Sequence, residues 1–189
     1  MAFEDHPVAE QHRVMQQADA VIIRLGDRAV IGGGRRAPAA VPASDRAARQ
    51  LSKLDDRRWF VIDGVGGTDH LVVGPAGVLA LQVRRLCGRV MAAEGNLLHN
   101  GTATHHATEA ATAARRVVSA LWRAGCASVV VRPVLVIEAD QFLADDAPTE
   151  AAIVASHRVR RWLERQPEAL DQADAFRIAI AARRPSTWG

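Results

Sequence analysis

The sequence predicts an α/β fold in which a helix, a three-stranded meander, a long helix and a buried strand follow one another. Three apolar, β-rich runs at residues 59–62, 70–73 and 78–83 are separated by glycine-containing turns. An alanine-rich segment at residues 105–123 is typical of a long helix, and a glycine suited to a helix end follows it. The nearly unbroken apolar run at residues 129–137 indicates a strand that is buried on both faces.

The length and composition are those of an ordinary globular chain. It has 189 residues, of which 49% are hydrophobic and 24% are charged, which argues against a disordered, collagen-like or coiled-coil protein. The longest apolar runs are far below the roughly 20 residues that a membrane-spanning helix needs, and the N-terminus lacks the pattern of a signal peptide. We therefore expect a cytoplasmic protein with no membrane partner. Cys87 and Cys126 are expected to be reduced thiols.

The positive charge is concentrated in the middle of the chain. The formal net charge is only +3, but residues 57–136 carry nine arginines against four acidic residues. A basic middle region is a weak indication of a polyanionic partner.

The chain divides into three parts at a stretch rich in glycine and proline. Residues 1–43 are expected to hold a polar helix, a small hairpin and a linker. Residues 44–166 are expected to form the main domain, in which Ser44 or Asp45 caps a helix that ends before Trp59. The other expected elements are short strands at residues 89–92, 97–98 and 152–155, a helix at residues 158–166, and a C-terminal segment at residues 167–189.

An eleven-residue block at the second strand carries a resemblance to a known family. Residues 68–78 read Thr-Asp-His-Leu-Val-Val-Gly-Pro-Ala-Gly-Val. This resembles the signature of the nuclease-related domain (NERD) family, in which an Asp-His pair opens a strand that ends in a Gly-Pro turn. Weaker matches at residues 88–90, 132–137 and 154–163 extend the likeness. The resemblance implies a restriction-endonuclease-like core and a phosphodiesterase site.

The resemblance also implies which residues form that site. Nucleases of this fold hold Mg²⁺ with acidic side chains, and a nearby lysine supports the nucleophile or the developing charge. The family pattern falls on Asp69, Gln82 and Arg84, so the second acid is an amide and the lysine is an arginine. Side chains two apart on a strand share a face, which is why such a pattern can converge. A further family glutamate aligns with Ser44, leaving Asp45 as an off-register substitute.

These replacements predict a degenerate phosphodiesterase site. Gln82 still offers a carbonyl oxygen, and related methyl-DNA restriction endonucleases carry Gln at this place. The guanidinium of Arg84 keeps its proton near neutral pH, although it can clamp a phosphate with two hydrogen bonds. The first hypothesis is therefore a nucleic-acid-binding or assembly module with weak or no cleavage and no cofactor. It would hold DNA or RNA through Arg84, Arg85 and Arg89.

Two further hypotheses remain open. One is an active nuclease dependent on Mg²⁺ or Mn²⁺, with Asp69, the Gln82 amide oxygen and the Val83 backbone carbonyl as metal ligands and with Arg84 stabilising the phosphorane charge. The other is a structural module that forms a homo-oligomer or binds a protein partner, since aromatic residues make up only 4% of the chain and offer few stacking platforms for single strands.

Structural interpretations compete with each functional one. Asp69 could close a turn, and Gln82 and Arg84 could form the solvent face of an edge strand. His70 is expected to be packed or hydrogen-bonded scaffold, and residues 105–106 are expected to start a helix rather than bind a metal. Solvated helix faces are expected for Arg115, Arg116, Arg123, Arg158, Arg160 and Arg161.

Overall fold

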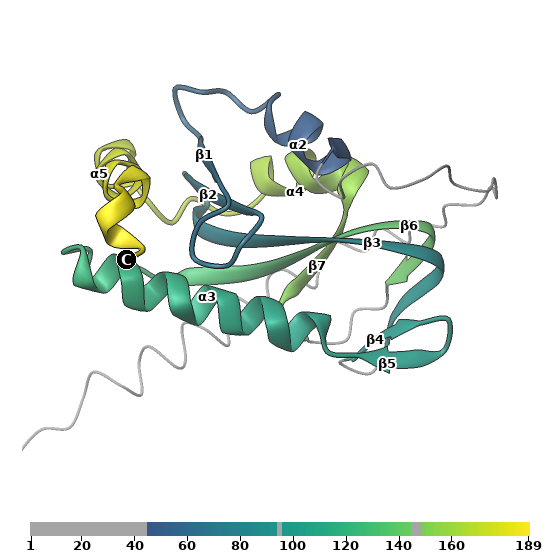
Figure 1. Cartoon of the computed structure of the whole chain (residues 1–189). Coiled ribbons are helices and arrows are strands. Elements are labelled where there is room, and N and C mark those ends of the chain that lie inside the picture. Colours follow the sequence, from purple (N-terminus) through teal and green to yellow (C-terminus); the bar gives the residue numbers. More distant parts are fainter. Residues whose placement is uncertain (1–44, 94–95, 145–148) are drawn as a thin grey trace, which may run out of the picture.

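The computed structural model describes residues 45–93, 96–144 and 149–189 (Figure 1). The strands are β1 (Phe60–Asp63), β2 (His70–Gly74), β3 (Gly77–Ala93), β4 (Asn96–His99), β5 (Thr102–Thr104), β6 (Val131–Ala144) and β7 (Ala152–Ala155). The helices are α2 (Asp45–Leu51), α3 (His106–Arg123), α4 (Val159–Glu164) and α5 (Gln172–Arg183), with short 3₁₀ turns η1 (Ser156–Arg158) and η2 (Pro185–Thr187). The predicted N-terminal helix, hairpin and linker lie outside the described residues.

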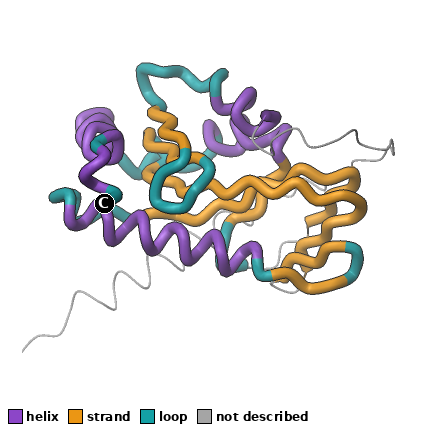
Figure 2. The backbone as a smooth tube through the Cα atoms, viewed as in Figure 1, coloured by secondary structure: helices purple, strands orange, loops and turns teal. Residues whose placement is uncertain are grey.

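The strands form one mixed sheet in which β3 is the central element. β1, β2 and the first half of β3 make an antiparallel meander, and β4 and β5 continue it from the far end of β3. β6 runs parallel to β3, and β7 runs parallel to β6. The strands form a layer with helices on both sides of it (Figure 2). The predicted α/β class, the meander and the buried position of β6 between two strands are therefore confirmed.

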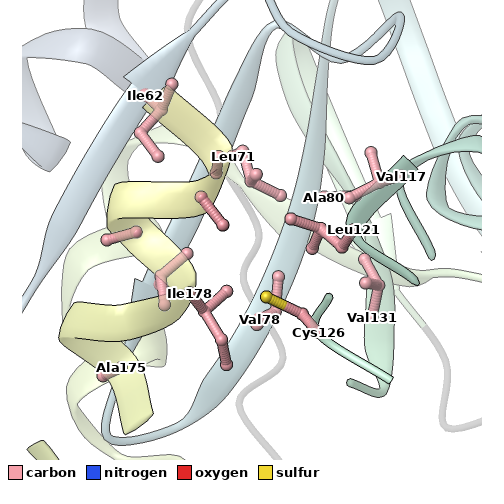
Figure 3. Packing of buried hydrophobic residues seen from close by; sticks show 14 of the residues in the cluster. Ile62, Leu71, Val78, Ala80, Val117, Leu121, Cys126, Val131, Ala175 and Ile178 are labelled. Atoms are coloured by element: carbon pink, nitrogen blue, oxygen red, sulfur yellow. The ribbon is translucent and has the colours of Figure 1, made fainter. Parts of the chain in front are cut away.

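Helices α3 and α5 cover one face of the sheet. Val78 and Ala80 of β3 point toward this face and share a core with Val117 and Leu121 of α3 and Ile178 of α5 (Figure 3). Residues 105–123 were predicted as a helix, and α3 confirms that prediction almost to the residue. It is followed by Gly125, whose φ of 89° lies in the left-handed region that glycine adopts most easily.

Helices α2 and α4 cover the opposite face (Figure 1). Leu79 and Leu81 alternate with the residues named above and pack against Leu51 of α2 and Leu163 of α4. This alternation follows from the two-residue period of a strand. The sheet thus lies between two helical layers, and the parity of a residue on β3 decides which layer its side chain meets.

β3 is longer than the sequence predicted. Residues 78–83 and 89–92, expected as separate strands, belong to one strand of 17 residues. Its register with β6 shifts between Leu86 and Arg89, where Gly88 has a φ of 94° and donates its N–H to Asp140 Oδ2 at 2.8 Å. A β-bulge at Gly88 adds one residue to β3, and the strand continues beyond it to Ala93.

Other parts of the prediction also differ from the structure. β6 spans Val131–Ala144, where residues 129–137 were predicted. α2 ends at Leu51 rather than before Trp59, because the following residues bond to carbonyls three residues back and Asp55 accepts the Arg57 N–H at 3.0 Å, closing a turn. A further strand, β5, forms because Asn100 and the glycine after it both have positive φ and make a tight hairpin turn. The C-terminal segment forms α5, which the sequence did not predict.

Candidate functional site

The residues of the predicted catalytic set lie together on the face that α3 covers. Gln82 and Arg84 continue the side of β3 that carries Val78 and Ala80, because side chains two apart share a face. Asp69 precedes β2 immediately, and its N–H donates to the carbonyl of Leu81 at 3.0 Å. The sequence left open whether Asp69 faces Gln82, and the structure brings both within reach of Arg84.

The Asp69 carboxylate ties the start of β2 to β3. Its Oδ2 accepts the backbone N–H of Val83 at 2.7 Å, a short hydrogen bond of the kind that an ionised acceptor forms. Its backbone carbonyl accepts the Gly64 N–H at 3.0 Å, which closes the loop between β1 and β2. Asp69 therefore closes the loop through its main chain, as the turn interpretation required, and also places a carboxylate at the site.

The Arg84 guanidinium contacts every group that was predicted to hold a metal ion. Nη1 donates to the Val83 carbonyl at 3.0 Å, and Nη2 donates to Gln82 Oε1 at 3.2 Å. Nη1 also lies 3.7 Å from Asp69 Oδ2. A permanent positive charge therefore lies among the predicted ligands.

Helix α3 adds Glu109, which the sequence analysis did not name as a candidate, and His106, which it expected only to start a helix. Glu109 Oε2 accepts a hydrogen bond from Arg84 Nη2 at 3.4 Å, and the same oxygen accepts one from His106 Nδ1 at 3.2 Å. The hydrogen bond from His106 holds the pKa of Glu109 below its ordinary value, and Arg84 acts in the same direction. The three-residue spacing of His106 and Glu109 on a helix was the available signal.

Gln82 is buried, although β3 has a strand partner on one side only at this point. The residue is only 8% exposed, and its strand partner is Leu135 of β6, since the pairing with β2 ends at Leu81. Its Nε2 donates to the Gly67 carbonyl at 3.2 Å. The solvent-face interpretation is therefore wrong for Gln82, which is buried, whereas Arg84 lies on a one-sided stretch of β3 and its side chain is 30% exposed.

His70 is packed and hydrogen-bonded, as the sequence predicted. His70 is 4% exposed, and its Nδ1 lies 2.6 Å from Asp63 Oδ1 across the β1–β2 pair. His105 is the residue before the first turn of α3, and the helix begins at His106. Cys87 and Cys126 are both unpaired, as expected.

The arginines predicted to contact nucleic acid do not form one cluster. Arg84 faces α3, whereas Arg85 has the opposite parity on β3, and its Nη2 lies 3.3 Å from Oε1 of Glu138 on the neighbouring strand. Arg89 is exposed beyond the bulge. Arg115, Arg116 and Arg123 are exposed on α3, as predicted.

The arrangement does not fit the divalent metal that the family resemblance implies. Mg²⁺ needs near-octahedral oxygen ligands at about 2.0–2.1 Å. Here the Asp69 carboxylate already holds a backbone N–H, and the guanidinium lies 3.0–3.7 Å from the three expected donors. Within the described ranges, no group of three or more His, Cys, Asp or Glu residues is placed to hold a metal ion.

Removal of the Asp69 carboxylate is expected to lower the free energy of unfolding. The Asp69→Ala variant should lose about 2 kcal/mol, because the buried Val83 amide is left without an acceptor. Asp69→Asn retains an oxygen that can accept the same hydrogen bond and should lose less than half as much. Urea denaturation of the three proteins measures the difference. Equal losses in the two variants would show that the Val83 contact contributes nothing.

Comparisons with known proteins identify no relative of this chain. No family model, no curated protein and no solved structure matches this chain. In the part of the chain that the structure describes, no helix is long and apolar enough to cross a membrane.

Proposed function

We propose that this chain is a NERD-like, nuclease-related protein whose phosphodiesterase site is degenerate, and that it acts as a nucleic-acid-binding or assembly module. One observation carries the proposal. The guanidinium nitrogens of Arg84 lie 3.0–3.7 Å from oxygen atoms of Asp69, Gln82 and Val83. A nuclease of this type would use these oxygen atoms to hold its metal ion. The order of elements also supports a restriction-endonuclease-like core, because a meander, a long helix and a parallel central strand bring the three side chains together.

The chemistry of the site favours the loss of cleavage. Phosphodiester hydrolysis in metal-dependent nucleases needs an ion that polarises the phosphate and activates water. The site has an amide in place of one carboxylate, and it has a guanidinium that keeps its proton in place of an amine. The guanidinium therefore covers the oxygen atoms that would hold the ion, and unlike an amine it cannot accept a proton from water near neutral pH.

Nucleic-acid binding is assigned to exposed arginines and not to Arg84. A phosphate at Arg84 would also meet the carboxylates of Asp69 and Glu109, which repel it. Arg89 on β3 and Arg115 and Arg116 on α3 are exposed. Such side chains bind phosphates without sequence preference, and the affinity falls steeply with salt.

The assembly alternative has its own supporting observation. Two helices on one side of the sheet carry exposed apolar side chains, among which Trp122 of α3 is 63% exposed and Phe176 of α5 is 53% exposed. Exposed aromatic residues of this kind are common in protein interfaces. A protein partner or a second copy of the chain is therefore the second candidate.

Incubation with labelled single- and double-stranded DNA and RNA tests the proposal. With Mg²⁺, Mn²⁺ or EDTA, we expect binding without cleavage, unchanged by EDTA and weakened about tenfold or more between 50 and 200 mM salt. The Arg115→Ala/Arg116→Ala variant should bind several-fold more weakly. Arg177→Ala, which removes an exposed arginine of α5, is the matched control and should bind as the wild type does.

Two outcomes would overturn parts of this proposal. Metal-dependent cleavage that disappears in Asp69→Ala would establish the active nuclease. Absence of binding to every nucleic acid at low salt would remove the nucleic-acid function, and sedimentation of the same sample would then test whether the chain self-associates.

A further inference from the structure

Four oxygen acceptors from three separate segments surround the Arg84 guanidinium. Asp69 contributes a carboxylate from the residue before β2, and Glu109 contributes another from α3. Gln82 and Val83 contribute an amide and a backbone carbonyl from β3 itself. All four oxygens lie 3.0–3.7 Å from a guanidinium nitrogen. The four oxygens thus form a cation-binding site, and the cation that they bind is the Arg84 guanidinium.

We infer that Arg84 is the resident cation of this site and that it excludes a divalent metal ion from it. The two carboxylates would repel each other without a cation between them, and the guanidinium supplies one positive charge and up to five N–H donors. Because arginine cannot be deprotonated in a protein, this cation stays in place over the whole physiological pH range. The inference rests on these contacts and not on the likeness to nucleases.

The contact with Glu109 joins two separate elements, although the Glu109 side chain is 51% exposed. Arg84 is on the central strand and Glu109 is on the helix that covers it, so their contact links the sheet to α3. His106 donates to the same Glu109 oxygen and holds the carboxylate toward Arg84. If the guanidinium is removed, two carboxylates and two neutral oxygens remain around the position it occupied. Mn²⁺ is a suitable probe, because carboxylate and carbonyl oxygens are ligands that it prefers.

Mn²⁺ binding to EDTA-treated protein tests this inference. The electron paramagnetic resonance signal of free Mn²⁺ and isothermal titration calorimetry would be measured for the wild type, Arg84→Ala and Arg84→Ala/Glu109→Gln. We expect no stoichiometric binding to the wild type. Arg84→Ala should bind one ion with a Kd on the order of 10⁻⁴–10⁻³ M, as in weak oxygen-ligand sites. The double variant should bind about tenfold more weakly or not at all, because one of two carboxylates is gone.

A matched control comes from the next residue of the same strand. Arg85 also contacts a glutamate, Glu138, but it has the opposite parity on β3 and lies away from Asp69 and Glu109. Arg85→Ala should therefore create no Mn²⁺ site. If Arg84→Ala does not fold, as judged by circular dichroism, Arg84→Met keeps the aliphatic stem without the charge and should bind the ion.

Two Mn²⁺-binding results would overturn this inference. Wild-type protein that binds Mn²⁺ and loses it in Asp69→Asn would overturn the inference, and so would a folded Arg84→Ala or Arg84→Met that binds none. Neither result depends on nucleic acid. A wild type that excludes Mn²⁺ and binds no DNA or RNA would leave this inference standing and would remove the nucleic-acid function.

Discussion

Ile178→Ala is expected to lower the free energy of unfolding by about 3 kcal/mol, the typical cost of truncating a large aliphatic side chain in a core. Ile178 is 1% exposed and packs from α5 against the β1–β2 side of the sheet, in a cluster that includes Leu71 and Val73 (Figure 3). Truncation leaves a cavity that the surrounding strands cannot fill, because they are held by their sheet hydrogen bonds.

The same helix offers a matched control. Ile180 has the same side chain two residues further along α5, but it is 39% exposed. Ile180→Ala should therefore cost less than about 1 kcal/mol. Urea denaturation at equal protein concentration measures both variants. Similar losses would mean that α5 does not pack on the sheet as described. The expected difference would show that residues 167–189 belong to the folded unit.

Gly66→Ala is expected to lower the free energy of unfolding by about 3 kcal/mol, through two separate effects. Its φ of 62° lies in the left-handed region, which costs an L-residue with a side chain about 1–2 kcal/mol. A Cβ there would also lie 2.7 Å from a methyl carbon of Val117 and 2.8 Å from the ring of Trp188. Forcing α3 or the C-terminal Trp188 outward adds a further cost of about 1–3 kcal/mol.

Gly64→Ala separates these two effects. Gly64 has nearly the same φ, 66°, but a Cβ at that position meets nothing within 4 Å. This variant should lose only the conformational part, about 1 kcal/mol. Thermal or urea unfolding gives both values. A loss in Gly64→Ala as large as that in Gly66→Ala would show that the close approach of α3 to this loop contributes nothing.

The Gly66 prediction also concerns the candidate site. The next residue, Gly67, offers the carbonyl that accepts the hydrogen bond from Gln82 Nε2. A shift of this loop would therefore release the Gln82 amide, whose oxygen is one of the acceptors around Arg84. We place Gly66 among the positioning residues of the site on this ground.

Much of the fold can be read from local pattern. The helix at residues 105–123 and the strand runs at residues 59–62, 70–73 and 152–155 were predicted close to their observed bounds, because apolar periodicity and glycine turns are local signals. Asp69, Gln82 and Arg84 were named as site candidates because the chain resembles the NERD family, and strand parity accounts for the shared face of Gln82 and Arg84. The differences from that family's pattern, at Ser44, Gln82 and Arg84, can be read from the printed sequence.

Long-range contacts decided the rest. The parallel pairing with β6 makes β3 continuous through the Gly88 bulge, and nothing near Gly88 in the sequence encodes its partner strand. The approach of α3 to the sheet brings Glu109 to Arg84, two residues that lie on separate elements. A charged pair of this kind depends on where two elements pack, and sequence spacing specifies only what happens within one element. For this reason the residue types at the site were predictable, whereas the occupation of the site by the Arg84 guanidinium was not.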